Sequence, residues 1–270
     1  MKRFVTVVML ILGLSCLVAC AKTTTERSET DRQEPVMESK TDAQQAGSEE
    51  APSSEALTDE KTEEEPKTMR SKLLYMGHAS IRITTPEEKT IYIDPFAGDG
   101  YEPAADLILV THDHYDHNDL TKIKNRSTDC ETITWKEALA NGKHQTFELP
   151  YVTVEAVEAG NNRNHSVSEC VGYILTLSDG TTVYVSGDTS KTEQMKALSE
   201  KAIDYAFYCC DGKYNMDLSE AAECARLVGA KHDIPYHVIP AEGAFFDRDR
   251  AKQFDSPNLL VIGEGEEIEL

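Results

Sequence analysis

Basic residues are scarce in this sequence of 270 residues. Lys and Arg number 27 against 48 Asp and Glu, which gives a formal net charge of −21 at pH 7. Such a charge repels nucleic acid phosphates and anionic membrane surfaces. The composition therefore predicts no nucleic acid partner and no attachment to lipid headgroups by charge. Acidity alone does not identify the substrate, which we expect to be a small molecule.

Cysteine is too rare for a fold whose stability depends on several disulfide bonds. Two of the 7 cysteines, Cys16 and Cys20, lie near the amino terminus, and the other five are Cys130, Cys170, Cys209, Cys210 and Cys224. An odd number leaves at least one thiol unpaired within the chain. The neighbours Cys209 and Cys210 would form a strained bridge, because adjacent strand residues point to opposite faces. We expect buried thiols.

Long apolar runs are missing except at the amino terminus, where Lys2 and Arg3 precede the apolar residues 4–18. Leu17-Val18-Ala19-Cys20 resembles a bacterial lipobox, which predicts a signal peptide over residues 1–20 and a lipid on Cys20. The alternative is an uncleaved signal anchor, since residues 4–21 make a stretch of 18 residues that barely spans a bilayer. Either form places the rest of the chain outside the cytoplasm, with the lipid anchor as its expected membrane contact.

Large apolar side chains are nearly absent from residues 21–68. This stretch holds 14 acidic and 6 basic residues and is rich in Glu, Thr, Ser and Gln. It cannot bury enough apolar surface to offset its chain entropy, so we predict a disordered acidic linker. A folded domain is then expected over residues 69–270.

The domain alternates short apolar runs with turn residues. Strands are expected over residues 72–76, 80–84, 90–94, 107–110, 152–157, 171–177, 183–188, 203–209 and 259–262. Helices are expected over 118–125, 135–140, 190–199 and 218–228, the last with Asp217 and Glu220 as a capping box and Gly229 past its end. No Ser/His/Asp triad and no phosphate-cradling glycine loop is found among these elements.

What the domain does have is a dense His/Asp motif. The apolar run 107–110 is followed by Thr111-His112-Asp113-His114-Tyr115-Asp116-His117. In an extended segment, side chains two positions apart point to the same side, so His112 and His114 can bind one ion together. Asp116 and His117 follow after a turn and can face a second ion. Imidazole and carboxylate ligands suit divalent zinc, manganese or iron.

His-x-His-x-Asp-His after an apolar strand resembles the signature of the metallo-β-lactamase superfamily of binuclear metal hydrolases. Three downstream features match in family order: the loop histidine His165, the strand ending Gly187-Asp188-Thr189, and His237 after Ile234-Pro235-Tyr236. The resemblance implies that His112, His114 and His165 hold the first metal, that Asp116, His117 and His237 hold the second, and that Asp188 bridges them. From the residues alone, Asp188 could instead cap the helix that follows it.

Two further motifs, Gly77-His78-Ala79-Ser80 and Ile93-Asp94-Pro95-Phe96, resemble the ascorbate-6-phosphate-lactonase-like branch of that superfamily. There the Asp corresponding to Asp94 orients a ligand histidine from outside the metal site. The alternative is that Asp94 shapes the turn before Pro95. His78 either lies near the site or is a structural turn residue.

The resemblance implies an α/β (α+β) fold, an αββα sandwich of two mixed β-sheets flanked by helices. It also implies a hydrolase that attacks a small ester, lactone or phosphodiester with a hydroxide bridging two divalent ions, zinc ahead of manganese and iron. Esters and lactones lead on the branch resemblance. Asp116 and Asp188 are the implied catalytic residues: Asp116 also relays the nucleophile's proton, and Asp188 fixes the metal spacing. Substrate contacts are expected from the loop over residues 118–164.

Two other functions stay open. The chain could be a non-catalytic metal-binding surface lipoprotein, although such a protein has no need of a bridging carboxylate. It could also be a relative of mononuclear iron oxidases. His114 stands where the oxygen-reducing di-iron relatives carry Glu, which disfavours redox chemistry. Cys210 opens the loop after its strand, and the sequence leaves open whether its thiol lies beside the metals.

Overall fold

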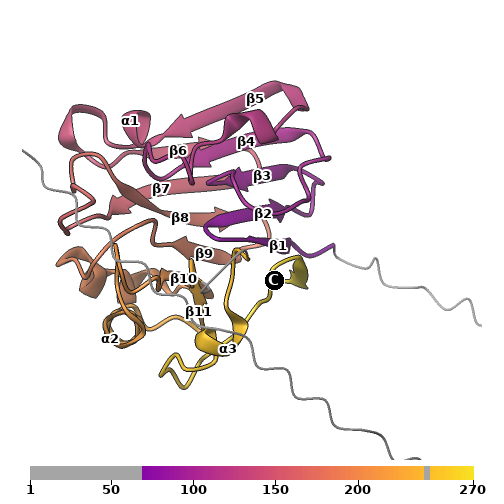
Figure 1. Cartoon of the computed structure of the whole chain (residues 1–270). Coiled ribbons are helices and arrows are strands. Elements are labelled where there is room, and N and C mark those ends of the chain that lie inside the picture. The colour runs from indigo at the N-terminus through magenta and orange to yellow at the C-terminus, as the bar shows by residue number, and fades with distance from the viewer. Residues whose placement is uncertain (1–68, 240–243) are drawn as a thin grey trace, which may run out of the picture. The chain divides into compact units, whose positions relative to one another are not determined.

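A computed structural model describes residues 69–239 and 244–270 of the chain (Figure 1). The predicted signal peptide with Cys20 and the predicted linker over residues 21–68 lie outside the described residues, and both stay predictions. Within the described ranges, no helix is long and apolar enough to cross a membrane.

The first of two sheets has six strands in the order β12–β1–β2–β3–β4–β5. Their bounds are Glu266–Glu269 for β12, Lys72–Gly77 for β1, Ser80–Thr84 for β2, Thr90–Ile93 for β3, Ala105–Val110 for β4 and Arg126–Thr134 for β5. The pairs from β12 to β3 are antiparallel, whereas β3, β4 and β5 run parallel. The sheet is therefore mixed, and the carboxyl ends of β3 and β4 lie at the same end of the sheet.

The second sheet also has six strands, in the order β11–β10–β9–β8–β7–β6. Their bounds are His232–Tyr236 for β11, Tyr205–Cys209 for β10, Thr182–Val185 for β9, Val171–Leu177 for β8, Val152–Glu158 for β7 and Thr146–Leu149 for β6. The strands from β6 to β9 pair antiparallel, and β9, β10 and β11 pair parallel. This sheet is mixed as well, and its three parallel strands end together.

The helices of the described chain are short. They are α1 (Trp135–Ala138), α2 (Leu218–Val228), α3 (Arg248–Ala251) and three 3-10 segments, η1 (Leu120–Lys122), η2 (Ala140–Gly142) and η3 (Gln194–Lys201). Helix α2 connects β10 to β11 and packs against both strands and against η3 (Figure 1). Two mixed sheets flanked by helices confirm the predicted αββα sandwich.

The core explains why residues 107–110 of β4 form an unbroken apolar run. Leu107 and Leu109 belong to the main core, to which both sheets contribute, whereas Ile108 and Val110 belong to a smaller cluster with Tyr92 and Tyr101. All six residues of β4 are buried. A strand covered on both faces has no polar side to show in its sequence. Four of the five domain cysteines are buried and free, as expected, while the fifth, Cys130, is only half-buried.

Several predicted elements were wrong in kind or place. Residues 118–125 form only the short η1 before the chain returns to the sheet as β5, and residues 190–199 are replaced by the later 3-10 segment η3. Residues 259–262 make a single bridge, Asp233 to Leu259, and the last strand is β12 instead. Strands β5, β6, β11 and β12 went unpredicted, and all four lie at sheet edges; β5, β6 and β12 have almost no buried side chains, whereas β11 is mostly buried.

The caps of α2 settle the role of Asp217. Its side chain accepts a hydrogen bond from Glu220 N at 2.8 Å, and Gly229 ends the helix in the left-handed conformation. The Glu220 side chain accepts a hydrogen bond from Lys191 N at 2.9 Å and not from the backbone of Asp217. The N-cap is therefore present, but the second hydrogen bond of a capping box is not. Asp188 caps nothing here, because η3 begins only at Gln194.

Candidate metal centre

The candidate site lies where parallel strands end. Asp94 follows β3, His112 opens the loop after β4, Asp188 follows β9, Asp211 follows β10 and His237 follows β11. Because the carboxyl ends of neighbouring parallel strands meet at one edge of a sheet, side chains from distant parts of the sequence gather there. The two sheets thus bring ligand-type residues together at one end of the sandwich.

Three histidines form a first cluster. His112 Nε2 lies 3.1 Å from His114 Nδ1, which in turn lies 3.2 Å from His165 Nε2. His112 and His165 are buried and His114 is exposed. The remaining ring nitrogens of the buried pair have partners, since His112 Nδ1 lies 3.0 Å from Thr111 Oγ1 and His165 Nδ1 lies 3.2 Å from Asn162 Oδ1. Three nitrogens therefore face one point, with the buried rings held from behind.

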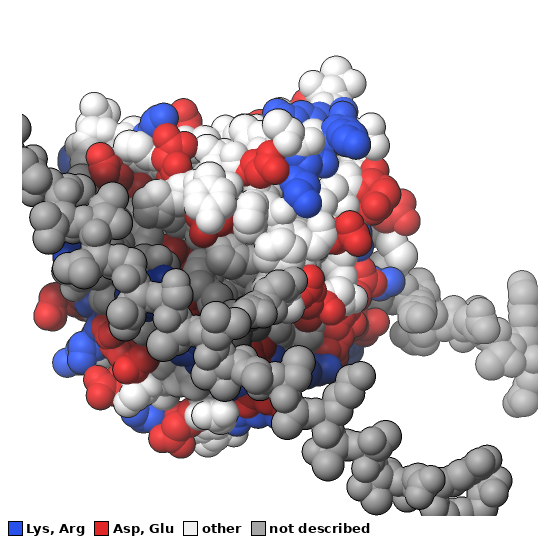
Figure 2. All heavy atoms as spheres, viewed as in Figure 1, with Lys and Arg blue, Asp and Glu red and all other residues white. Residues whose placement is uncertain are grey.

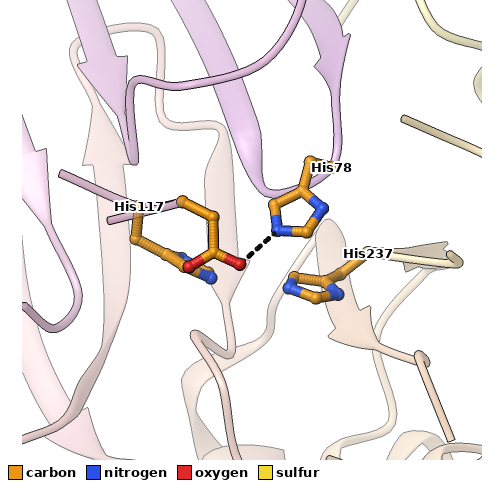
Figure 3. A group of neighbouring side chains, drawn as sticks. His78, His117 and His237 are labelled. Atoms are coloured by element: carbon orange, nitrogen blue, oxygen red, sulfur yellow. Dashed lines mark hydrogen bonds and ion pairs between the residues drawn. The ribbon is translucent and has the colours of Figure 1, made fainter. Parts of the chain in front are cut away.

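A second cluster contains His117, His237, Asp116 and one residue beyond the predicted set, His78. Figure 3 shows the three imidazoles facing one another. The His78 and His237 ring centroids are 3.8 Å apart, and His78 Nε2 lies 3.2 Å from Asp116 Oδ2. All three histidines are buried, whereas Asp116 is half-buried. The predicted ligands of the second metal are thus gathered around one place.

Asp188 lies between the two clusters. Its Oδ2 is 3.4 Å from His165 Nε2, and its Oδ1 is 3.4 Å from His117 Nε2 and 3.5 Å from His237 Nε2. Each oxygen of one buried carboxylate therefore addresses a different group of histidines. This is the geometry that a carboxylate needs to bridge two cations.

The unpaired atoms of the site fit a metal. His117 Nε2, Asp188 Oδ1 and both ring nitrogens of His237 are buried without a hydrogen-bond partner among the described residues. Leaving such groups unpaired costs free energy, and native proteins pair nearly all of them. Neutral imidazole nitrogens and carboxylate oxygens are suitable donors for zinc and related ions. A divalent cation would pair His117 Nε2, Asp188 Oδ1 and His237 Nε2, whereas His237 Nδ1 faces Asp211 at 3.8 Å.

Asp94 anchors the motif loop from behind. Its Oδ1 accepts a hydrogen bond from Thr111 N at 2.8 Å, and its Oδ2 accepts one from Thr111 Oγ1 at 2.7 Å and lies 2.8 Å from His117 Nδ1. The carboxylate is fully buried. A donor on Nδ1 leaves His117 Nε2 as the free lone pair that faces Asp188. The contacts favour orientation of His117 over a purely local turn.

The backbone is strained at the site. Asp94, His78 and His237 have φ angles of 45°, 51° and 53°, in the left-handed region that residues other than glycine rarely adopt. Hydrogen bonds hold the last two segments together, since His237 N donates to His78 O at 2.9 Å. Gly187 adopts φ +61°, and a Cβ there would lie 2.7 Å from Val171 O. Strain of this kind gathers at functional sites.

The electrostatics favour neutral imidazoles at His112, His165 and His78 and an ionised carboxylate at Asp188. Burial, followed by the neighbouring His117, lowers the pKa of His112 to about 2. Burial also lowers the pKa of His165 and of His78. Burial would raise the pKa of Asp188, but the facing imidazoles of His237 and His117 outweigh it and hold that pKa well below its ordinary value. Burial would lower the pKa of His117, but the carboxylates of Asp188 and Asp94 outweigh it and raise that pKa, so a metal would displace a proton from this imidazole.

The sequence analysis did not identify two residues that support the site through polar contacts, Asp211 and Asn215. Asp211 Oδ2 lies 3.8 Å from His237 Nδ1, and the Asn215 amide donates to both Asp211 and Asp188, at 2.6 and 2.7 Å. The signal for Asp211 was its place directly after β10, beside Asp188 after β9. Cys210 is absent from the candidate ligand groups among the described residues, and its thiol donates to Tyr208 O instead.

Replacing His78 with phenylalanine is expected to weaken zinc binding at the second cluster by about 10- to 100-fold, because Asp116 loses the group that orients it. Competition with a chromophoric chelator measures the affinity of each site. The matched control is His232→Phe, an exposed histidine at the opposite end of β11. Equal affinities in the two variants would remove His78 from the site.

An open cleft of about 600 Å³ leads to the two clusters. Its lining residues are His78, Phe96, His114, Tyr115, Asp116, Asn164, His165, Asp188, Tyr214, His237, Ile239, Ala244 and Phe245. Substrate contacts were expected from residues 118–164, yet only Asn164 of that stretch lines the cleft. Much of the stretch builds β5, β6 and β7, which belong to the sheets, while Trp135 and Asn164 line a smaller cavity beside His112 and His114, so substrate contacts from this stretch stay a prediction.

Comparison with known proteins defines the class. The beta-lactamase superfamily domain matches residues 72–237. A UPF0173 metal-dependent hydrolase of Thermococcus kodakarensis is 30% identical over 229 residues, covering 74% of this chain and 99% of the relative. One of Pyrococcus furiosus is 29% identical over 228 residues, with the same two coverages. The crystal structure of a metal-dependent hydrolase of Parabacteroides distasonis is 31% identical, covers 69% of this chain and 90% of that chain, and superposes with a TM-score of 0.56.

Fold, site and relatives agree on a metallo-hydrolase of the predicted superfamily. The chain belongs to the metallo-β-lactamase superfamily and, within it, to the UPF0173 family of metal-dependent hydrolases. The resemblance to ascorbate-6-phosphate lactonases stays a prediction from the motifs at residues 77–80 and 93–96. The predicted lipobox lies outside the matched residues.

Proposed function

We propose that the chain is a binuclear hydrolase that cleaves a small ester, lactone or phosphodiester outside the cytoplasm. The observation that carries the proposal is the placement of the Asp188 carboxylate, whose two oxygens face different histidine groups at 3.4 to 3.5 Å. When bound, two divalent ions supply a water of lowered pKa and polarise the oxygen that gains negative charge. Zinc is the ion that we expect first.

The chain's own residues hold and orient the reacting groups. His112, His114 and His165 would hold one ion, and His117, His237 and Asp116 the other, with Asp188 shared between them. Asp116 faces the cleft and interacts with His78 Nε2 through Oδ2. Burial would raise the pKa of Asp116, but the His78 contact and the nearby His117 outweigh it and hold that pKa below its ordinary value. Asp116 is therefore ionised and placed to accept a proton from the attacking water.

The location outside the cytoplasm rests on the sequence. Lys2 and Arg3, the apolar run and the Cys20 lipobox support export and a lipid anchor. The rival functions are a non-catalytic metal-binding lipoprotein and a mononuclear iron oxidase. A large cleft that opens directly onto Asp188 and Asp116 supports the hydrolase over a binding protein.

Metal add-back separates the three functions. The purified protein is stripped with a chelator and then titrated with zinc, manganese or ferrous iron, while hydrolysis of 4-nitrophenyl acetate, a γ-lactone and bis(4-nitrophenyl) phosphate is followed. We expect activity on at least one of them to rise until about two equivalents are bound. Oxygen consumption with a single iron, or two bound ions without turnover of any of the three, would overturn the proposal.

A further inference from the structure

One wall of the cleft is a row of aromatic rings. Phe96 lies in the middle, with its centroid 5.8 Å from that of Tyr115 and 5.6 Å from that of Phe245. Both contacts are edge-to-face, at 89° and 78°. The three rings come from the loop after β3, from the metal motif itself and from the segment before α3. Residues far apart in the sequence thus build one continuous aromatic wall.

The aromatic wall is exposed, although large apolar side chains are usually buried in a folded protein. Tyr115 is 80% exposed and Phe245 is 37% exposed. Within the described ranges, five large apolar residues are exposed to this degree, and three of them, Tyr115, Phe245 and Tyr214, line this cleft. Aromatic surface gathered in a concave site indicates an apolar ligand group, because burying it there gains free energy.

The cleft holds no cation of the protein. No Lys or Arg is among the described residues that line it, and its acidic side chains are Asp116 and Asp188. Lys213 lies beside the cleft, but its ammonium packs over the Tyr214 ring at 4.6 Å. Acidic side chains are scattered over the face seen in Figure 2. An anionic group remote from the reacting bond would be desolvated there without a partner, which disfavours its binding.

We propose that the cleft selects uncharged carboxylic esters and lactones that carry an aromatic or bulky apolar group, and that Phe96, Tyr115 and Phe245 bind this group. The inference rests on the proposed hydrolase function and narrows its substrate class. Esters and lactones that bear a separate phosphate or carboxylate are poor substrates, since they bring an anion that the walls of the cleft cannot pair. The volume of the cleft lies within the range of small-ligand sites.

The reaction needs only water as co-reactant. The water oxygen forms a bond to the carbonyl carbon, the acyl carbon–oxygen bond breaks, and a proton passes to the departing alkoxide to give the alcohol. No electron transfer is involved. The aromatic wall takes no part in bond making. It places the carbonyl group over the clusters by binding the apolar end of the molecule.

Matched methyl esters test the inference on the zinc-loaded full chain. Methyl phenylacetate carries an aromatic acyl group, methyl acetate has none, and monomethyl succinate carries a carboxylate. We expect kcat/KM for methyl phenylacetate to exceed that for methyl acetate by about 50-fold, from the burial of one phenyl ring. Monomethyl succinate is expected to be the slowest of the three. Acid release at constant pH measures all three rates.

Two variants locate the selectivity. Tyr115→Ala and Phe245→Ala are each expected to lower the phenylacetate-to-acetate ratio by about tenfold. Tyr205→Ala, the same change at the opposite end of β10, is expected to keep the ratio, and bound zinc is counted in every variant. Turnover with equal kcat/KM for the three esters, or an unchanged ratio in both wall variants, would overturn the inference alone. No turnover of any ester or phosphodiester with two zinc ions bound would overturn the proposed function itself.

Discussion

Replacing Asp188 with alanine is expected to lower kcat/KM for ester hydrolysis by at least about a thousandfold and to reduce the number of bound ions. The variant removes both oxygens that face the two histidine groups, and with them the group that would offset the repulsion between neighbouring cations. Metal-based stabilisation of the transition state is worth several kcal/mol, which corresponds to a loss of this size. Steady-state kinetics and elemental analysis of the same preparation measure the two effects.

Asp113→Ala is the matched control for that variant. Asp113 belongs to the same motif, but it is exposed, accepts a hydrogen bond from Asn118 and does not line the cleft. Its replacement is expected to leave kcat/KM within about twofold, because its side chain is exposed and belongs to none of the candidate ligand groups. Full activity and full metal content in Asp188→Ala would remove Asp188 from the centre.

Replacing Asp94 with alanine is expected to destabilise the metal-free protein by about 3–5 kcal/mol. Thr111 N, Thr111 Oγ1 and His117 Nδ1 all lie within 2.8 Å of the buried carboxylate oxygens. Each of these three buried groups would lose its hydrogen-bond partner in the variant. Urea unfolding of the chelated protein gives the free energy of unfolding without a contribution from metal binding.

Two further variants separate the causes of that loss. Asp94→Asn keeps the shape and an acceptor but loses the charge, so we expect a smaller loss of about 1–3 kcal/mol. Asp106→Ala removes a carboxylate at the other end of the same parallel pair, whose side chain is 12% exposed and accepts a hydrogen bond from Thr90 N, and about 1 kcal/mol is expected there. If Asp94→Ala costs no more than Asp106→Ala, the claim that Asp94 anchors the motif loop is wrong.

The central strands could be predicted from the sequence, and the edge strands could not. Strand β4 could be predicted because both of its faces are buried, so every position except Asp106 is apolar. Strand β5 at the edge of the same sheet buries only Ile133, and its sequence, Arg126 to Thr134, resembles a polar loop. Edge strands owe their pairing to a neighbour, which is information that their own residues do not carry.

The candidate ligands could be predicted from the sequence because metal chemistry fixes both their residue type and their local spacing. Four of them stand within six residues, from His112 to His117. Asp211 and the aromatic wall could not be predicted, because their positions in the site depend on contacts between distant parts of the sequence. Asp211 joins the site only through the pairing of β9 with β10, and Phe96, Tyr115 and Phe245 meet only through the fold. Side chains whose role depends on distant neighbours leave no local pattern.

The central claim is that two groups of side chains, joined by Asp188, hold two metal ions. Elemental analysis of the purified protein, combined with a titration of the chelated protein with zinc, tests this claim most directly. We predict close to two zinc ions per chain and two binding steps that both disappear in Asp188→Ala. One ion per chain at saturation, or binding that is unchanged in Asp188→Ala, would contradict it.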